Sequence, residues 1–94
     1  MVILKVTQKH IDQAAEVLTG DPAAFRSQNC PVALALRDKF VAAKSVGVDG
    51  TFAYIYYYFE AKKRVLKLGK RGTKFILRFD HGKTVKPTTL ILRG

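Results

Sequence analysis

Acidic residues are scarce in this chain, which holds 7 Asp and Glu against 17 Lys and Arg and carries a formal net charge of +10. Cysteine is scarcer still, because Cys30 stands alone and cannot form an internal disulfide, which fits a reducing compartment. The longest apolar run, residues 52–59, is far shorter than the roughly 18 residues of a membrane span. The N-terminus also lacks the basic and apolar stretches of a secretory signal. These absences predict a soluble, non-secreted protein.

The length and composition predict one folded domain. A chain of 94 residues has room for one modest hydrophobic core. Its 48% apolar residues are ordinary for a globular protein, so the excess charge does not indicate a disordered tail. Neither a repeat nor a linker divides the sequence, and we therefore expect a single domain over residues 1–94.

The basic excess is confined to the C-terminal third of the chain. Residues 1–60 hold 6 basic and 6 acidic groups, whereas residues 61–94 hold 11 basic groups and one acid, Asp80. One-sided charge of this kind indicates a polyanionic partner: a nucleic acid first, an anionic membrane surface or an acidic protein second. The alternative is a lysine-rich face that only keeps the protein in solution.

The N-terminus predicts a strand followed by a helix. Residues 1–6 have the composition of a short strand, and Thr7 then caps a helix whose apolar residues recur at helical spacing. We expect Gly20 to end this helix as its C-terminal cap.

A second helix is predicted after a polar connection. The connection covers residues 21–29 and contains Pro22. Pro31 then opens the helix at the position where its missing N–H costs nothing. Because this helix is apolar over much of its circumference, we expect it to be the most buried one.

Short strands follow. Val46 and Val48 precede Asp49-Gly50, a dipeptide that favours a type I′ turn. The next strand, residues 51–59, is apolar on both faces and is expected in the centre of a sheet. One face carries Phe52, Tyr54, Tyr56 and Tyr58, and the other carries Ala53, Ile55, Tyr57 and Phe59.

The remaining strands complete a sheet. A turn at residues 60–63 and a strand at residues 65–68 give a three-stranded antiparallel meander, and residues 88–92 form a final strand after Pro87.

Residues 70–81 are open to two interpretations. As a strand they alternate poorly, whereas as a helix they separate four cations from three large apolar side chains. The first turn has no acidic residue, and Gly72 weakens a helix by about 1 kcal/mol. We favour a helix that ends at Gly82. The cations are Lys70, Arg71, Lys74 and Arg78, and the apolar residues are Phe75, Ile76 and Phe79.

This basic helix face is the first candidate binding site. Lysine and arginine neutralise phosphates and release condensed counterions, so such a cluster predicts salt-dependent binding. Phosphate contacts position a protein and do not by themselves read a base sequence. A solvated helix face is the alternative. The candidate residues are Lys62, Lys63, Arg64 and Lys67 before the helix, Lys70, Arg71, Lys74 and Arg78 on it, and Lys83 after it.

The tyrosines are the second candidate. Aromatic side chains on a sheet face beside basic residues stack bases in several proteins that bind single strands, which makes Tyr56 and Tyr58 candidate binding residues. The alternative is an ordinary sheet core, which we expect for Phe52, Tyr54 and Ile55.

RNA-recognition domains offer a weak parallel. Residues 71–79, RGTKFILRF, match their RNP1 pattern only in part. The expected element order also differs from the βαββαβ plan of such domains.

Signatures of catalysis and metal binding are missing. The chain has no CxxC, HExxH, GxxxxGK[ST] or GxGxxG motif, and its acids are not paired as general acid and base catalysis requires. His10 and His81 do not form a metal signature, and Cys30 is expected to be structural. We therefore expect no enzyme, no metal and no cofactor.

Two segments resemble a group of small proteins encoded by bacteriophages and prophages. Residues 30–40, CPVALALRDKF, and residues 79–87, FDHGKTVKP, are similar to a C-P-[VI]-A-L-A-L helix and an F-D-x-G-x-x-V-x-P segment of that group, and residues 6–11 extend the similarity. The resemblance implies a helix over residues 73–79. It also implies a phage origin, but no mechanism, because the group has no established activity. The relatives tend to carry acidic or neutral residues at Lys70, Arg71 and Lys83.

The sequence thus predicts an α+β domain, a mainly antiparallel sheet with packed helices in the order β-α-α-β-β-β-α-β. We expect a small non-enzymatic phage-type protein that binds DNA or RNA through its basic C-terminal surface, in the cytoplasm of the bacterial host and without a membrane. The alternative is a stoichiometric inhibitor of a bacterial host or defence protein, such as an anti-CRISPR, which contacts a nucleic-acid-associated protein complex. Free sheet edges are compatible with a monomer or a homodimer.

Overall fold

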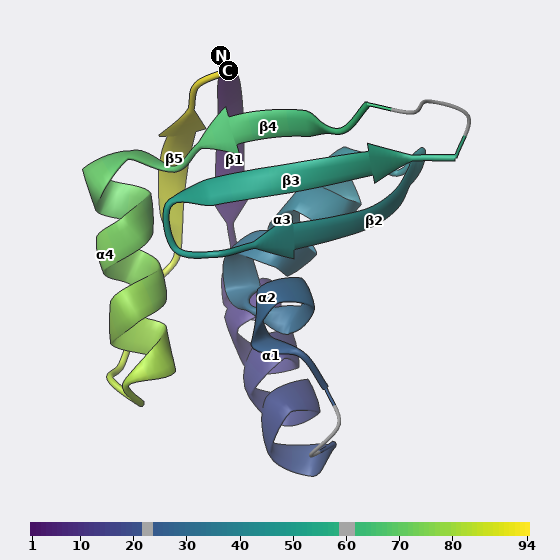
Figure 1. The fold of residues 1–94 in the computed structure, drawn as a ribbon. Helices are drawn as coiled ribbons and strands as arrows, with labels where there is room; N and C mark the ends of the chain where they lie inside the picture. Colours follow the sequence, from purple (N-terminus) through teal and green to yellow (C-terminus); the bar gives the residue numbers. More distant parts are fainter. Residues whose placement is uncertain (22–23, 59–61) are drawn as a thin grey trace.

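The computed structural model describes residues 1–21, 24–58 and 62–94 (Figure 1). The fold is α+β, as the sequence predicted, with one short helix more than expected, in the connection after α1. Pro22, Phe59 and the first part of the turn predicted at residues 60–63 lie outside the described residues. The elements are β1 (Val2–Val6), α1 (Gln8–Gly20), α2 (Arg26–Asn29), α3 (Pro31–Lys39), β2 (Ala43–Val48), β3 (Phe52–Tyr57), β4 (Arg64–Lys67), α4 (Gly69–Asp80) and β5 (Thr88–Leu92).

The strands form two antiparallel sheets instead of the single sheet expected. β2, β3 and β4 make the predicted meander with β3 in its centre, and β1 pairs with β5. The sheets meet where Lys67 N–H donates to Arg93 O at 2.6 Å and Arg93 N–H donates to Lys67 O at 3.1 Å. This one bridge joins the edge of the meander to the end of β5.

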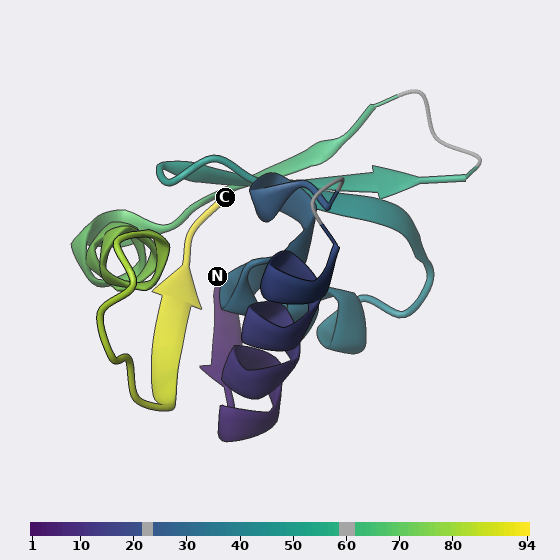
Figure 2. The ribbon, with the colours of Figure 1, turned by 90° about the horizontal axis from the view of Figure 1, so that it is seen from below.

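The helices leave one face of the meander uncovered. In Figures 1 and 2, α1 and α3 lie on one side of the three strands, α2 lies at the β2 edge, and α4 lies beside the strands, next to β5. Within the described part of the chain, no helix lies over the opposite side. The side chains of β3 follow this arrangement, since Ala53 and Ile55 are fully buried and Phe52 and Tyr54 are half-buried.

The core lies between the helices and the covered sheet faces. The first six residues of α3, Pro31 to Leu36, are all buried, which confirms the prediction of a highly buried helix. Cys30 caps this helix, with its Sγ accepting the Ala33 N–H at 3.5 Å, and burial raises the pKa of its thiol. Cys30 is therefore a buried capping residue and not an activated nucleophile.

Thr7 is the N-cap of α1, as predicted. His10 Nδ1 accepts the Thr7 N–H at 3.0 Å, so the ring proton sits on Nε2 and faces Asp38 Oδ2 at 2.6 Å. Thr7 Oγ1 lies 3.1 Å from the same Nδ1. The three side chains are ordered like a nucleophile, base and acid, but Nδ1 is already occupied as the helix cap. This cluster fixes the start of α1 against the end of α3.

Two expected turns differ from the structure. Gly20 does not cap α1, because it lies within the helix with a negative φ, and Asp21 ends the helix in an extended conformation. The Asp49-Gly50 turn is not type I′, since only Gly50 has a positive φ, of 96°. The Asp49 carboxylate instead accepts the N–H groups of Thr51 at 2.9 Å and Phe52 at 2.7 Å, as in an Asx turn.

α4 confirms the helix predicted over residues 70–81. Gly82, with a φ of 73°, donates to Phe79 O at 3.0 Å, and Lys83 N–H donates to Arg78 O at 2.9 Å, which is the pattern of a Schellman cap. Gly72 is required by packing, because a Cβ there would lie 2.9 Å from Leu68 Cβ. Among the described residues, no helix has the length and apolar character to cross a membrane.

Candidate nucleic-acid interface

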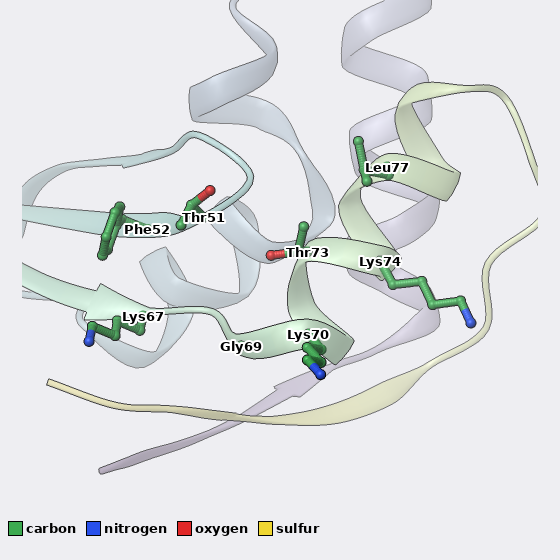
Figure 3. A pocket seen from close by; sticks show the side chains of 8 residues that line it. All are labelled: Thr51, Phe52, Lys67, Gly69, Lys70, Thr73, Lys74 and Leu77. Atoms are coloured by element: carbon green, nitrogen blue, oxygen red, sulfur yellow. The ribbon is translucent and has the colours of Figure 1, made fainter.

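A groove of about 550 Å³ runs between α4 and the uncovered side of β3 and β4 (Figure 3). Its apolar surface comes from Phe52 of β3 and from Leu77, whose side chain is exposed although it is large and apolar. Lysines of β4 and of α4 also line it, and in Figure 3 the side chains of Lys67 and Lys74 extend in opposite directions from it. The lining residues are Thr51, Phe52, Lys67, Gly69, Lys70, Thr73, Lys74 and Leu77.

The walls of the groove are fixed to each other by hydrogen bonds. Gly69, with a φ of 73°, turns the chain from β4 into α4, a conformation that favours glycine. Thr73 Oγ1 donates to Gly50 O at 2.6 Å, and Leu68 N–H donates to Thr51 O at 3.0 Å. The helix is thus bound to the tip of the β2–β3 hairpin, and the groove is preformed.

The groove is electrostatically one-sided. Lys67, Lys70 and Lys74 are exposed, and among the described residues that line the groove there is no carboxylate. The first turn of α4 also has no acidic residue and its N-cap makes no side-chain hydrogen bond. Because a helix N-terminus carries partial positive charge, lysines placed there repel it. The cations near this end of α4 are therefore unfavourable for the helix itself.

The other cations of α4 point elsewhere. All four predicted cations are exposed, whereas Phe75 and Ile76 are buried and Phe79 is half-buried, so the predicted division holds fully for two of the three apolar residues. Arg71 Nη2 donates to Thr88 Oγ1 at 3.3 Å and is turned towards β5. Arg78 lines a separate hollow beside residues 84–88. Only two of the four cations of α4 therefore line the groove.

The cations before and after α4 do not form one cluster. Arg64 lies opposite the inward-facing Ile55, and its Cζ is 5.5 Å from the centre of the Phe40 ring, on the side that the helices cover. Lys63 Nζ lies 5.4 Å from the centre of the Tyr54 ring, on the open side. The remaining two, Lys62 and Lys83, are exposed, and Lys83 lines a groove beside α1.

The uncovered sheet face carries an aromatic row. Phe52 and Tyr54 do not lie in the core as expected, because the helices cover only the opposite face of β3. Tyr56 is 41% exposed and Tyr58 is 68% exposed. The Phe52 and Tyr54 ring centres are 6.3 Å apart, with the ring planes tilted by 49°. Ile55, also expected in the core, is fully buried.

Tyr54 is held in place by the hairpin turn. Its hydroxyl donates to Asp49 Oδ2 at 3.0 Å, and this bond raises the pKa of the Tyr54 phenol. The N–H groups of Phe52 and Thr51 in turn lower the pKa of Asp49. At neutral pH, Asp49 is ionised and the Tyr54 ring is neutral and oriented.

Sequence reasoning missed most of the groove. Thr51, Thr73 and Leu77 gave no signal, because their roles depend on how α4 docks on the hairpin. Phe52 and Lys67 lie opposite each other in adjacent strands, so their common face becomes clear only once the register is known.

Metal-binding groups are not clustered. Within residues 1–21, 24–58 and 62–94, no three His, Cys, Asp or Glu side chains lie close enough to hold a metal ion.

Comparison with models of protein families, with curated proteins and with solved structures gives no match for this chain. Inferences about its function therefore depend on the chemistry of the groove and of the open sheet face.

Proposed function

We propose that this protein binds nucleic acid through the groove between α4 and β4. Lys67, Lys70 and Lys74 contact the phosphates, and the exposed arginines of α4 extend the positive surface. The observation that carries the proposal is the set of three lysines on one preformed groove with no carboxylate among its described lining residues.

The charge arrangement favours a bound polyanion over simple solubility. A solvating surface works well with both signs of charge interspersed, and the helix dipole disfavours cations near an N-terminus. Lys70 and Arg71 nevertheless occupy the second and third positions of α4. A phosphate backbone would relieve the repulsion between these cations and release counterions.

The proposed setting is the cytoplasm of a phage-infected bacterium. The resemblance to small phage proteins supports this setting, in which a small non-enzymatic protein, as a monomer or a homodimer, meets DNA, RNA or a complex that carries them. Binding of nucleic acid in the groove requires no membrane.

Fluorescence anisotropy with labelled DNA and RNA over a salt series tests the proposal. If three phosphates are contacted, the logarithm of the binding constant should fall with the logarithm of salt concentration with a slope of about −2 to −3. The groove variant carries Lys67→Gln, Lys70→Gln and Lys74→Gln. It should bind about tenfold more weakly or worse at roughly 100 mM salt, where the Debye length is about 10 Å.

A matched control removes the same charge elsewhere. Lys5, Lys9 and Lys44 are exposed and lie outside the groove, so their triple Gln variant has the same net charge as the groove variant. Its affinity should stay within about threefold of the wild type, since only long-range attraction is lost. Equal losses in both variants, or an affinity that does not fall with salt, would overturn the proposal.

The inhibitor alternative is separated by a pull-down from nuclease-treated bacterial lysate. The wild type could retain a protein that the groove variant does not, while neither purified DNA nor RNA binds. That outcome would make an acidic protein surface the partner in place of nucleic acid. Loss of all partners after nuclease treatment supports nucleic-acid binding.

A further inference from the structure

We infer that the nucleic acid is single-stranded and that its bases stack on the aromatic row Phe52, Tyr54 and Tyr56. The inference rests on the proposed function and adds its substrate class. The groove lysines hold the backbone, and the open face of the meander receives the bases.

The aromatic row is accessible. Phe52, Tyr54 and Tyr56 alternate along β3 and share the face that no described helix covers (Figures 1 and 2). The neighbouring β2 residues are small: Gly47 lies opposite Tyr54 and Ser45 opposite Tyr56. A Cβ built on Gly47 would meet no atom within 4 Å, so the space beside Tyr54 is open.

The row and the groove form one surface. Phe52 is both the first member of the row and a lining residue of the groove. Lys67 lies directly opposite Phe52 in the β3–β4 ladder and lines the same groove. A backbone that follows Lys67 and Lys70 therefore passes beside Phe52, with its bases able to turn onto the row.

The contacts within the row suit stacking. The hydrogen bond from the Tyr54 hydroxyl to Asp49 holds the Tyr54 ring in one orientation. This order reduces the conformational entropy that the side chain would lose on binding. Lys63, from the exposed end of the β3–β4 hairpin, already places its ammonium over this ring. Its side chain is exposed and can move to a phosphate when a base takes its place.

Asp49, an acid beside the row, is ionised, and local hydrogen bonds stabilise its charge. The Asp49 carboxylate accepts three hydrogen bonds, from two backbone N–H groups and from the Tyr54 hydroxyl. It lies at the turn, whereas the lysines flank the row on the β4 side. Phosphates are therefore drawn to the β4 side, and the aromatic rings lie between the two.

The chemistry distinguishes a single strand from a duplex. Base stacking on an aromatic ring contributes about 1–3 kcal/mol per base and needs bases whose faces are free. A duplex offers phosphates to the lysines but keeps its bases stacked within the helix. Single strands should therefore bind more tightly than duplexes of equal length.

Anisotropy with a labelled 12-nucleotide single strand and the corresponding 12-base-pair duplex tests the inference. Phe52→Leu and Tyr56→Leu keep apolar bulk but remove the ring, and each should weaken single-strand binding by about 5- to 150-fold, the range expected for one stacked base. Tyr56→Phe, the control, keeps the ring and should stay within about twofold. Duplex affinity should not change in either Tyr56 variant, because Tyr56 lies outside the groove.

Tyrosine fluorescence gives a second measurement. The chain has no tryptophan, and its four tyrosines are Tyr54, Tyr56, Tyr57 and Tyr58, all in or next to β3. Stacked bases should quench this emission, whereas a duplex held only by its phosphates should leave it unchanged. Circular dichroism of each variant shows whether the fold is retained.

The outcomes separate the two proposals. If neither probe binds, the proposed function fails. If both bind but the duplex is bound at least as tightly, or neither leucine variant weakens single-strand binding, the stacking inference is overturned and the proposed function stands. Preferential, quenched and ring-dependent binding of the single strand supports both.

Discussion

The Tyr54 hydroxyl donates a hydrogen bond of 3.0 Å to the Asp49 carboxylate, which joins the aromatic row to the turn that begins its strand. The other carboxylate oxygen accepts the backbone N–H groups of Thr51 at 2.9 Å and Phe52 at 2.7 Å. One side chain therefore closes the β2–β3 turn and orients the central ring of the open face.

Replacing Asp49 should weaken the hairpin. Asp49→Ala removes the acceptor of two backbone N–H groups and should lower the free energy of unfolding by about 1–2 kcal/mol, while Asp49→Asn keeps a side-chain oxygen and should lose less. Urea denaturation at pH 7 measures both. A wild-type midpoint for Asp49→Ala would contradict the role of this side chain.

Asp49 should also make stability depend on pH. The N–H groups of Phe52 and Thr51 lower the pKa of Asp49 in the folded protein. The stabilisation is therefore present above the unfolded pKa, near pH 4, and is lost as the pH falls through the lower folded pKa. Exposure of the carboxylate to solvent keeps the effect small. The stabilities of the wild type and of Asp49→Asn should converge as the pH falls below about 4; a constant difference in stability would contradict this expectation.

Gly72 should not tolerate alanine, although alanine is the better helix former. Its Cβ would lie 2.9 Å from Leu68 Cβ, so Gly72→Ala should cost about 1–3 kcal/mol through overpacking. Gly20→Ala is the control, because this glycine is also helical and its added Cβ meets no atom within 4 Å. Thermal unfolding should show a change between zero and about 1 kcal/mol of stabilisation for Gly20→Ala. The reverse order would show that α4 shifts to accept the methyl group.

His10 should be important for stability and not for chemistry. His10→Ala removes the acceptor of the Thr7 N–H and the partner of Asp38, and should destabilise the protein by about 2–3 kcal/mol. Asp38→Asn keeps an acceptor for the ring N–H and should cost less than about 1 kcal/mol. Denaturant unfolding compares the two, and an equal or larger loss in Asp38→Asn would mean that the charge of Asp38 dominates.

The two cations at the ends of β4 should differ in their effect on nucleic-acid binding. Arg64 lies over Phe40 on the covered side, whereas Lys67 lines the groove. Both Lys67→Gln and Arg64→Gln remove one charge, so they differ only in position. Under the proposed function, Lys67→Gln should weaken binding severalfold and Arg64→Gln should change it less than about twofold. Anisotropy at one salt concentration checks this difference. Equal effects would show that net charge, and not the groove, governs binding.

The sequence by itself determined most of the local structure. Thr7 and Pro31 mark where helices begin, Gly82 ends α4, and the meander and the basic face of α4 follow from residue spacing. These features depend on neighbours a few residues apart, which a linear pattern records directly. The predictions of a cap at Gly20 and of a type I′ turn at Asp49-Gly50 were wrong. A dipeptide or a single glycine permits several backbone conformations, and contacts with other residues select one.

The tertiary structure decided which side of each strand is used. An apolar strand such as β3 offers Ile55 and Tyr54 on opposite faces, and only the placement of the helices buries the first and leaves the second on the open face. The same placement sends Arg64 to the covered side and Lys67 to the groove, and it makes Gly72 necessary beside Leu68. Packing between distant segments fixes these choices, because charge and hydrophobicity along the chain are the same whichever face the helices cover.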